Sequence, residues 1–292
     1  MVAQRPRTEL LVIAGTTASG KSDLAMKIAK QFNGEIVSAD SWTVYKRFDI
    51  GTSKPTITQQ KAVKHHLLDV REAADGFNAP MFKGMAEKAV KNVQEQGKLP
   101  ILAGGTGLYI DSLLYDFGFL PSVSRAERER FNSMSLPELA EIALLQNIDL
   151  TGIDARNKRR LIRAIEAKGE QPTKKELRHN TLIVGLWLES EELKQRIEQR
   201  VDAMLAAGLE KEVEELSKKY GWDIEPMKGI GYREWQSYFS GGQTLEETRQ
   251  RIISATNNLA KRQRTWFKRS PDIQWFSSAE EAYRFISSNL ST

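Results

Sequence analysis

The feature that most constrains the fold of this chain is an eight-residue stretch near its N-terminus. It reads Gly15-Thr16-Thr17-Ala18-Ser19-Gly20-Lys21-Ser22 and fits the phosphate-binding pattern G-x-x-x-x-G-K-[ST]. The apolar run before it, residues 10–14, is typical of a buried strand, and residues 23–29 have the apolar spacing of an amphipathic helix. A glycine loop between a strand and a helix turns backbone N–H groups toward an anion. The stretch therefore predicts an α/β fold with a site for phosphate groups, in which Lys21 adds a charge and the Ser22 hydroxyl holds Mg²⁺.

Length and composition restrict the class of protein further. The chain has 292 residues, which favours one α/β core with a smaller second domain. It contains no cysteine, so disulfides and thiolate zinc sites are excluded, in keeping with a reducing cytoplasm. Residues 1–7 lack the apolar segment of a signal peptide, and there is no apolar run of about 18 residues. We expect a soluble cytoplasmic protein with no membrane contact, and a monomer.

Two further apolar segments predict strands that end at chemically useful residues. Residues 35–39 lead into Asp40, and residues 99–103 lead into a Gly-Gly pair and Thr106. A helix over residues 80–96 is expected between them, so the pattern is typical of a P-loop NTPase-like parallel sheet with flanking helices. Ligands of such sheets gather at the C-terminal ends of the strands. The phosphate loop, Asp40 and Thr106 should therefore face one crevice.

An inserted helical subdomain is expected in the middle of the chain. Strand signals vanish between residues 121 and 174, and the sequence there becomes charged and helical. The catalytic core would then comprise residues 1–120 and 175–292. Within its second part we expect a strand over residues 181–187 and three helices, over residues 191–207, 210–219 and 245–268.

Two of the expected helices concentrate positive charge in a chain whose net charge is +5. Over residues 156–165, Arg156, Arg160 and Arg163 follow i, i+4, i+7 spacing and would share one helix face. The segment from Arg249 to Arg269 holds seven basic residues and no acidic one. Such clusters suit nucleic-acid phosphates. The alternative is a solvated basic face, or a patch that faces diphosphate.

Several longer motifs resemble the bacterial tRNA dimethylallyltransferases (tRNA isopentenyltransferases). In chain order they are residues 38–46, 49–55, 65–69, 104–109, 195–200, 229–234 and 260–267. The resemblance runs from about residue 9 to residue 269. It implies transfer of a dimethylallyl group from dimethylallyl diphosphate to N6 of adenosine 37 in tRNA, next to the anticodon. Diphosphate leaves, and Mg²⁺ is the implied cofactor.

The resemblance also implies roles for individual residues. Asp40 would be the general base that takes a proton from N6, and Lys21, Thr106, Arg200 and the loop Gly15 to Ser22 would stabilise the leaving diphosphate. The metal ligand would be Ser22. Contacts with the anticodon stem-loop would come from four places: Asp40, Ser41, Trp42 and Thr43; Thr106; Arg159, Arg160, Leu161, Ile162 and Arg163; and Lys228, Gly229, Ile230, Gly231, Tyr232 and Arg233.

Read without the resemblance, the phosphate loop leaves other functions open. One is a P-loop kinase of a small molecule or nucleotide, with Asp40 as metal ligand or as base for a hydroxyl. Another is an RNA-binding protein gated by ATP. His65 and His66 have no partner at metal-ligand spacing, so a packing role is expected, and Trp42 is the expected stacking surface for a base. The chain departs from the usual family residues at Thr16, Thr43, Arg47, Met81 and residues 154–157.

Overall fold

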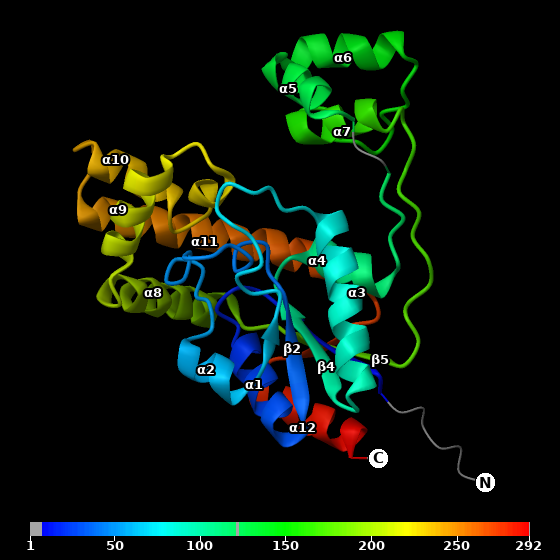
Figure 1. Cartoon of the computed structure of the whole chain (residues 1–292), viewed down its shortest axis with the longest axis vertical. Helices are drawn as coiled ribbons and strands as arrows, with labels where there is room; N and C mark the ends of the chain where they lie inside the picture. Colours follow the sequence, from blue (N-terminus) through cyan, green and yellow to red (C-terminus); the bar gives the residue numbers. More distant parts are fainter. Residues whose placement is uncertain (1–7, 121–122, 292) are drawn as a thin grey trace. The chain divides into compact units, whose positions relative to one another are not determined.

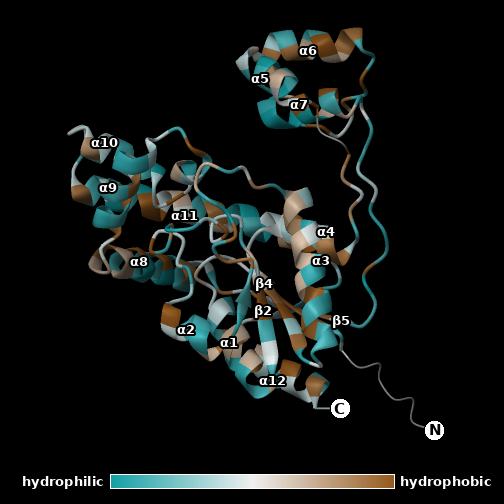
Figure 2. Cartoon of the chain, in the orientation of Figure 1, coloured by the Kyte–Doolittle hydropathy of each residue, from teal (hydrophilic) through white to brown (hydrophobic). Residues whose placement is uncertain are grey.

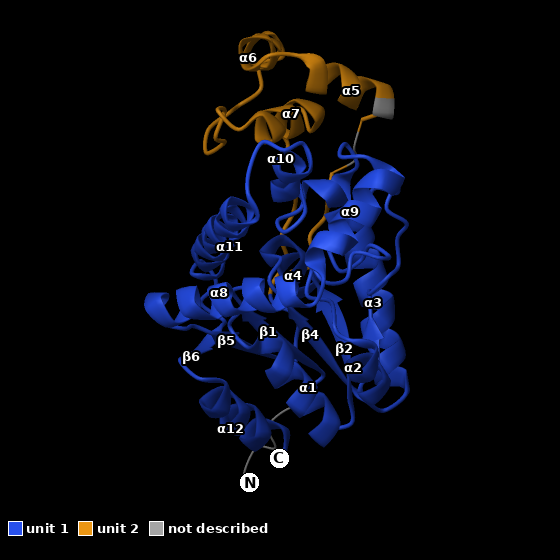
Figure 3. Cartoon of the chain, turned by 90° about the vertical axis from the view of Figure 1, so that its left-hand side faces the viewer, with its two compact units in different colours: residues 1–114, 177–292 blue, residues 115–176 orange. Residues whose placement is uncertain are grey.

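The computed structural model describes residues 8–120 and 123–291 and divides into two compact units (Figure 3). Unit 1 contains the chain up to Leu114 and from Leu177 onward, and unit 2 runs from Tyr115 to Glu176. The sequence places the insertion at residues 121–174, and residues 121 and 122 lie outside the described residues. Among the described residues, none of the helices combines the length and apolarity that a membrane span requires.

Unit 1 is built on a parallel sheet, shown in Figure 1. Its strands in the described chain are β1 (Leu10–Gly15), β2 (Gly34–Ala39), β3 (His65–His66), β4 (Leu99–Gly104), β5 (Thr181–Leu186) and β6 (Gln274–Phe276). They lie in the order β3-β2-β4-β1-β5-β6, and each neighbouring pair is parallel. Val12 of β1 pairs with Leu102 on one side and Ile183 on the other, and every residue of β1 is buried. Burial on both faces explains the unbroken apolar run of this strand.

Unit 1 also contains helices, most of which carry both apolar and polar residues (Figure 2). They are α1 (Lys21–Gln31), α2 (Ile57–Ala62), α3 (Ala79–Glu95), α4 (Gly107–Leu114), α8 (Ser190–Ala206), α9 (Leu209–Tyr220), α10 (Gln236–Phe239), α11 (Leu245–Phe267) and α12 (Ala279–Leu290). Helices α1 and α12 share one apolar core with Leu11 and Ile13 of β1. Helices α3 and α4 pack together through the stacked rings of Phe82 and Tyr109, 4.2 Å apart.

A second apolar core joins the C-terminal helices to the segment that follows β2. It contains Ile197 and Val201 of α8, Val213 of α9, Ile252 of α11, and Val44 and Phe48 from the segment after β2. Trp235, in a short 3-10 helix (Arg233–Trp235), is fully buried within it. This core fixes α8 and α11 beside the residues that come directly after Asp40.

The structure confirms the expected elements of the core and adds several that the sequence reading missed. The strands at 10–14, 35–39, 99–103 and 181–187 and the helices at 80–96, 191–207, 210–219 and 245–268 are present within one or two residues at most ends. The missed elements are β3, β6, α2, α4, α10 and α12. Strands of two or three residues are too short to show a period. Helix α2 did carry a signal, the capping box formed by Thr56 and Gln59.

Unit 2 consists of three helices, α5 (Arg125–Ser133), α6 (Leu136–Leu145) and α7 (Lys158–Glu166), within its described residues. Leu139, Leu161 and Ile165 are among the residues of its core. Helix α7 begins at Lys158 because Asn157 caps it, its side chain accepting from the Arg160 N–H at 3.3 Å. The expected helix over 156–165 is therefore wrong at its start: Arg156 precedes the helix and does not share a helix face with Arg160.

Candidate functional site

The phosphate loop has the geometry that its glycines predict. Gly15 ends β1 with φ +154°, and a Cβ at this position would lie 2.9 Å from Ser19 Oγ and 3.1 Å from the Leu186 carbonyl oxygen. Gly20 has φ +90° and is the residue before α1, which begins at Lys21. The loop thus turns sharply and leads directly into a helix N-terminus. Both features favour bound anions.

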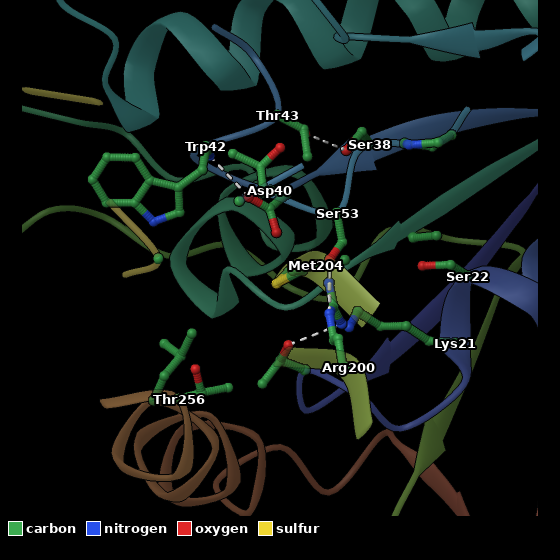
Figure 4. A pocket seen from close by; sticks show the side chains of 18 of the residues that line it. Lys21, Ser22, Ser38, Asp40, Trp42, Thr43, Ser53, Arg200, Met204 and Thr256 are labelled. Atoms are coloured by element: carbon green, nitrogen blue, oxygen red, sulfur yellow. Dashed lines mark hydrogen bonds between the residues drawn. The ribbon is translucent and has the colours of Figure 1, made fainter. Parts of the chain in front are cut away.

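The C-terminal ends of the central strands open into one cavity of about 320 Å³, seen in Figure 4. Its wall includes Lys21 and Ser22 from the start of α1, Asp40 after β2, and Arg200 from α8. The prediction places the phosphate loop, Asp40 and Thr106 in one crevice; it is confirmed for the loop and Asp40, whereas Thr106 is not among the lining residues. Thr106 lies at the same sheet edge, where its Oγ1 accepts from the Ser41 N–H at 3.2 Å. Thr106 therefore holds the backbone of Ser41, the residue next to Asp40, by a hydrogen bond.

Arg200 reaches the phosphate loop from the second core. Its Nη1 donates to Thr17 Oγ1 at 3.2 Å, and its Nε donates to Ser53 Oγ at 2.8 Å. Burial lowers the pKa of Arg200, while the charges of Asp40 and Asp23 act in the opposite direction. The guanidinium is thereby held beside the loop by two hydroxyl groups. Ser53 lies within the motif at residues 49–55, but its sequence context indicated no role for it.

Lys21 is the second cation at the site. Its Nζ donates to the Thr16 carbonyl oxygen at 3.0 Å. Burial and, after it, the positive charge of Arg200 lower the pKa of Lys21 from 10.5 to about 8, while Asp40 acts in the opposite direction. Two cations and a helix N-terminus therefore converge on one side of the cavity. Such an arrangement favours a polyanion over a neutral ligand.

The Asp40 carboxylate is oriented by the backbone that follows it. Its Oδ1 accepts from the Trp42 N–H at 2.8 Å, and Figure 4 shows the side chain at the cavity wall. The Ser38 and Thr43 hydroxyls lie 3.1 Å apart in a buried hydrogen bond beneath it. Thr43 is thus a buried residue, whereas Asp40 and Trp42 are partly exposed. A carboxylate with a fixed direction can take a proton from a group bound in the cavity.

The segment from Lys228 to Arg233 borders the cavity through its glycines. A Cβ at Gly229 would lie 3.2 Å from the Trp42 ring, and one at Gly231, where φ is +92°, would lie 3.2 Å from the Gly51 carbonyl oxygen. Ile230 and Gly231 line the cavity. Tyr232 is buried, and its hydroxyl donates to Glu212 Oε1 at 2.7 Å. Within this segment Lys228 and Arg233 are exposed at the surface.

One part of the cavity wall is apolar. It is formed by Ile197, Val201 and Met204 of α8 and by Ile252 and Leu259 of α11. These side chains follow helical spacing, so in the sequence they could not be told from ordinary core residues. Their position next to the cations gives the cavity a surface for a hydrocarbon group beside a surface for phosphates.

The donor set suits a metal ion that is held chiefly by its substrate. No cluster of three or more histidine, cysteine or acidic side chains able to hold a metal occurs in residues 8–120 and 123–291. Ser22 does present its hydroxyl at the cavity, close to the phosphate loop. Mg²⁺ commonly takes one or two protein ligands and completes its shell with substrate phosphates and water. The residues present therefore fit Mg²⁺ bound together with a diphosphate.

His65 and His66 form the short strand β3 at the edge of the sheet. His66 Nε2 lies 2.7 Å from Oε2 of the buried Glu35, and His65 Nδ1 lies 2.8 Å from the Val63 carbonyl oxygen. Burial lowers the pKa of His65. Both residues are thus hydrogen-bonded within unit 1, and His65 also lines the cavity.

In the two predicted clusters some basic residues bond to other parts of the chain, and several are exposed to solvent. Arg249 is bonded to Asp202 at 2.6 and 3.0 Å, and Arg264 lies over the Trp187 ring. Residues of α11 exposed to solvent include Arg251, Lys261 and Arg262. In α7, Leu161 and Ile162 are buried in the core of unit 2 and Arg163 donates to the Leu120 carbonyl oxygen, whereas Arg159 and Arg160 are exposed.

Comparison with known proteins gives matches over most of the chain. The sequence model of the IPP transferase family matches residues 43–270. A protein of Pediococcus pentosaceus named tRNA dimethylallyltransferase is 41% identical over 283 residues, which cover 92% of this chain and 90% of the relative.

Solved structures of similar proteins agree with this match. The tRNA isopentenylpyrophosphate transferase of Bacillus halodurans superposes with a TM-score of 0.75 at 31% identity, covering 98% of this chain and 97% of that one. A eukaryotic dimethylallyltransferase, described as acting on tRNA, gives a TM-score of 0.80 at 26% identity, covering 92% of this chain and 73% of that one.

Proposed function

The chain belongs to the IPP transferase family and is a prenyltransferase of tRNA, and from this premise we propose the reaction in detail. The donor is dimethylallyl diphosphate, and the acceptor is N6 of adenosine 37, beside the anticodon. The new bond joins N6 to C1 of the dimethylallyl group, while the bond from C1 to the diphosphate oxygen breaks. The observation that carries this proposal is the cavity that a carboxylate and two cations share, with Asp40 on its wall together with Lys21 and Arg200.

In this proposal Asp40 acts as the general base. The N6 amine of adenine is a weak nucleophile because its lone pair is delocalised into the ring. Removal of an N6 proton by Asp40 as the carbon–nitrogen bond forms would strengthen it, an effect worth about 10²–10⁴ in rate. The bond from the Trp42 N–H to Asp40 Oδ1 keeps the carboxylate directed for this transfer.

The phosphate loop holds the leaving group. Negative charge grows on the diphosphate as the carbon–oxygen bond breaks, so donors that point at it lower the barrier. The loop N–H groups, Lys21 and Arg200 supply these donors, and Thr17 and Ser53 hold Arg200 in place. The apolar wall formed by α8 and α11 accepts the five-carbon group.

Mg²⁺ fits the site with Ser22 as its protein ligand and the diphosphate as its principal partner. When bound, it would neutralise charge on the diphosphate and help it to leave. Because the protein contributes few ligands, its affinity for Mg²⁺ alone should be low and should rise with diphosphate present.

Recognition of tRNA requires the target base to leave the stack of the anticodon loop. Pulling a base out costs a few kcal/mol, which contacts with the neighbouring nucleotides must offset. The partly exposed Trp42 ring provides a stacking surface next to Asp40. Backbone phosphates would be met by exposed basic residues, among them Arg159 and Arg160 of α7 and Lys228 and Arg233. We further propose that the protein acts as a monomer in the cytoplasm.

The kinase alternative is not favoured. A generic phosphate-loop kinase would share the strand, loop and helix of residues 10–31 but not the match that extends through residue 270. The apolar wall is also better suited to the hydrocarbon of an isoprenoid diphosphate than to the nucleoside part of a nucleoside triphosphate. An RNA-binding protein gated by ATP would form no covalent product, which separates it from the proposed transferase.

The test is transfer of label from radioactive dimethylallyl diphosphate to an unmodified anticodon stem-loop in the presence of Mg²⁺. We expect one labelled adenosine per stem-loop with the unsubstituted protein and no ATP requirement. Asp40→Asn, which keeps the shape of the side chain, should lower kcat by about 10²–10⁴. The matched control is Asp75→Asn at an exposed aspartate, which should leave kcat unchanged.

Two outcomes would count against the proposal. If the unsubstituted protein transferred no label but hydrolysed ATP or phosphorylated a small acceptor, the transferase function would be refuted. If Asp40→Asn kept full kcat, the reaction would stand and the assignment of the base would be wrong.

A further inference from the structure

One glutamine side chain of α11 bridges two loops at the head of the sheet. Gln263 Oε1 accepts from the Thr17 N–H of the phosphate loop at 2.8 Å. Its Nε2 donates to the carbonyl oxygen of Gly105, in the turn between β4 and α4, at 3.0 Å. Gln263 also lines the cavity. A single amide group therefore uses its acceptor on one loop and a donor on the other.

The turn after β4 is shaped to receive this part of α11. A Cβ at Gly105 would lie 2.3 Å from Gln263 Nε2, and one at Gly107 would lie 2.2 Å from the Trp266 ring. Trp266 Nε1 in turn donates to Asp111 Oδ2 of α4 at 2.8 Å. The glycines of the motif at 104–107 thus give the helix the close approach that the amide bridge needs.

The bridge continues to the residues that flank Asp40. The residue after Gly105 is Thr106, whose N–H donates to the Ala39 carbonyl oxygen at 3.1 Å and whose Oγ1 accepts from the Ser41 N–H at 3.2 Å. Ala39 and Ser41 are the neighbours of Asp40. Since β1, β4 and β2 are adjacent in the sheet, these bonds link three successive strand ends.

The strand ladders do not by themselves fix these ends relative to one another. The paired registers of β1, β4 and β2 stop at Ala14, Gly104 and Ala39, and the functional groups lie beyond them. Beyond the ladders, one backbone bond joins Thr106 N–H to the Ala39 carbonyl oxygen, and side-chain bonds add further links: Gln263 joins the first loop to the second, and Thr106 Oγ1 joins the second to the third.

We propose that Gln263 is a positioning residue that sets the phosphate loop at the correct distance from Asp40. This inference rests on the proposed function, because it requires the diphosphate in the loop and the base at Asp40 to act on one acceptor. Gln263 acts through Thr17 and Gly105. A displacement of about 1 Å between reacting groups can lower the rate about 100-fold, so the loss of a single bridging amide can have an effect of this size on kcat.

A direct contact between Gln263 and RNA is the competing role for a polar residue on a basic helix. The two roles differ in what they change. Loss of an RNA contact raises KM for the stem-loop and leaves kcat nearly constant, whereas loss of positioning lowers kcat and leaves that KM nearly constant.

The first part of the experiment compares Gln263→Met, Gly105→Ala and the double variant with the unsubstituted protein. Methionine keeps the length of the side chain without its amide. We expect Gln263→Met to lower kcat by about 30- to 100-fold with KM for the stem-loop within threefold. Gly105→Ala should be similarly impaired because its Cβ meets Gln263 Nε2. The double variant should be no worse than Gln263→Met, since methionine has no hydrogen bonds to hold it against the new Cβ and can turn away from it.

The second part measures amide hydrogen exchange and does not depend on transfer. In Gln263→Met we expect faster exchange in the peptide that contains Thr17 and in the peptide that contains Ser41. The matched control is Gln250→Met, at an exposed glutamine of the same helix whose amide bonds only Glu246 within its own helix. It should change neither the exchange nor kcat.

The outcomes separate this inference from the proposed function. Unchanged kcat in Gln263→Met, a raised KM alone, or additive losses in the double variant would each overturn the positioning role. If the unsubstituted protein transferred no label, the proposed function would fail. The bridge would then be judged by exchange alone: faster exchange at both peptides in Gln263→Met would support it, and unchanged exchange would overturn it.

Discussion

Raising the pH should switch off donor binding by removing the charge of Lys21. Burial and the neighbouring Arg200 lower the pKa of Lys21 to about 8 in the free protein. With that value, about nine-tenths of the molecules carry the charge at pH 7 and about one-tenth at pH 9. If the charged form alone binds the diphosphate productively, kcat/KM for dimethylallyl diphosphate should fall about tenfold between these pH values. An ordinary lysine, with a pKa near 10.4, would give almost no change.

The assay is initial-rate label transfer at limiting donor and saturating stem-loop, from about pH 6.5 to 9.5 at constant ionic strength. Because kcat/KM reports the free enzyme, its alkaline limb should lie near pH 8, whereas the limb of kcat should lie higher, since bound diphosphate favours the charged form. Lys21→Arg is the control. Arginine stays protonated throughout this range, so its profile should be flat on the alkaline side even if its absolute rate is lower.

Unfolding cannot account for such a loss through Lys21. A lysine whose pKa is lower in the folded state than in the unfolded state loses its proton at a lower pH when the protein is folded. The unfolded state then binds more protons between about pH 8 and 10.5, so this titration raises the free energy of unfolding as the pH rises. The reasoning would be refuted if kcat/KM stayed constant to pH 9, or if Lys21→Arg showed the same alkaline limb.

Three further predictions concern RNA binding and stability. Arg160→Ala removes one exposed cation of α7. In filter-binding titrations, the slope of log affinity for the stem-loop against log salt concentration should become shallower by about 0.7–0.9. An unchanged slope would contradict a contact between Arg160 and an RNA phosphate. Leu161→Ala should lower the free energy of unfolding of the insertion by about 2–5 kcal/mol in urea titrations, because Leu161 is 0% exposed in the core of unit 2. Tyr232→Phe deletes the hydrogen bond to Glu212, whose carboxylate still accepts from the Ile50 and Gly51 N–H groups. The free energy of unfolding should therefore fall by about 1 kcal/mol in the same titrations. A fall above about 3 kcal/mol would mean that the hydroxyl contributes more than this one bond.

The central layer of the fold could be predicted from the sequence because its signals are local. Fully buried parallel strands require unbroken apolar runs, and a phosphate loop requires glycines at fixed spacing. Helix α11 carried its own start signal, the capping box formed by Thr244 and Glu247. Short elements such as β3 lacked such signals, since two residues show no period. The start of α7 was misjudged because charge spacing was followed instead of the cap at Asn157.

The candidate site was predictable only in part for a related reason. Asp40 directly follows a recognisable strand, and Lys21 and Ser22 begin the helix that follows another, so topology alone brings them to one edge of the sheet. Gln263 and Ser53 lie in the motifs at residues 260–267 and 49–55, but the sequence assigned neither of them a role, because a polar residue in a helix or loop looks the same whether it faces water or another loop. Leu161 and Ile162 lie in a motif assigned to tRNA, yet their side chains are part of a core.

The sequence by itself therefore determined the chemistry of the phosphate loop, the parallel order of strand and helix, and the family. Each of these depends on residues that are close together in the chain. Tertiary structure decided which groups meet across long separations: Arg200 with Thr17, Gln263 with both Thr17 and Gly105, and the apolar wall from α8 and α11 beside Lys21. These contacts depend on how the helices pack on the sheet. Packing is determined by side-chain volumes and by contacts between distant residues, which no local sequence pattern predicts.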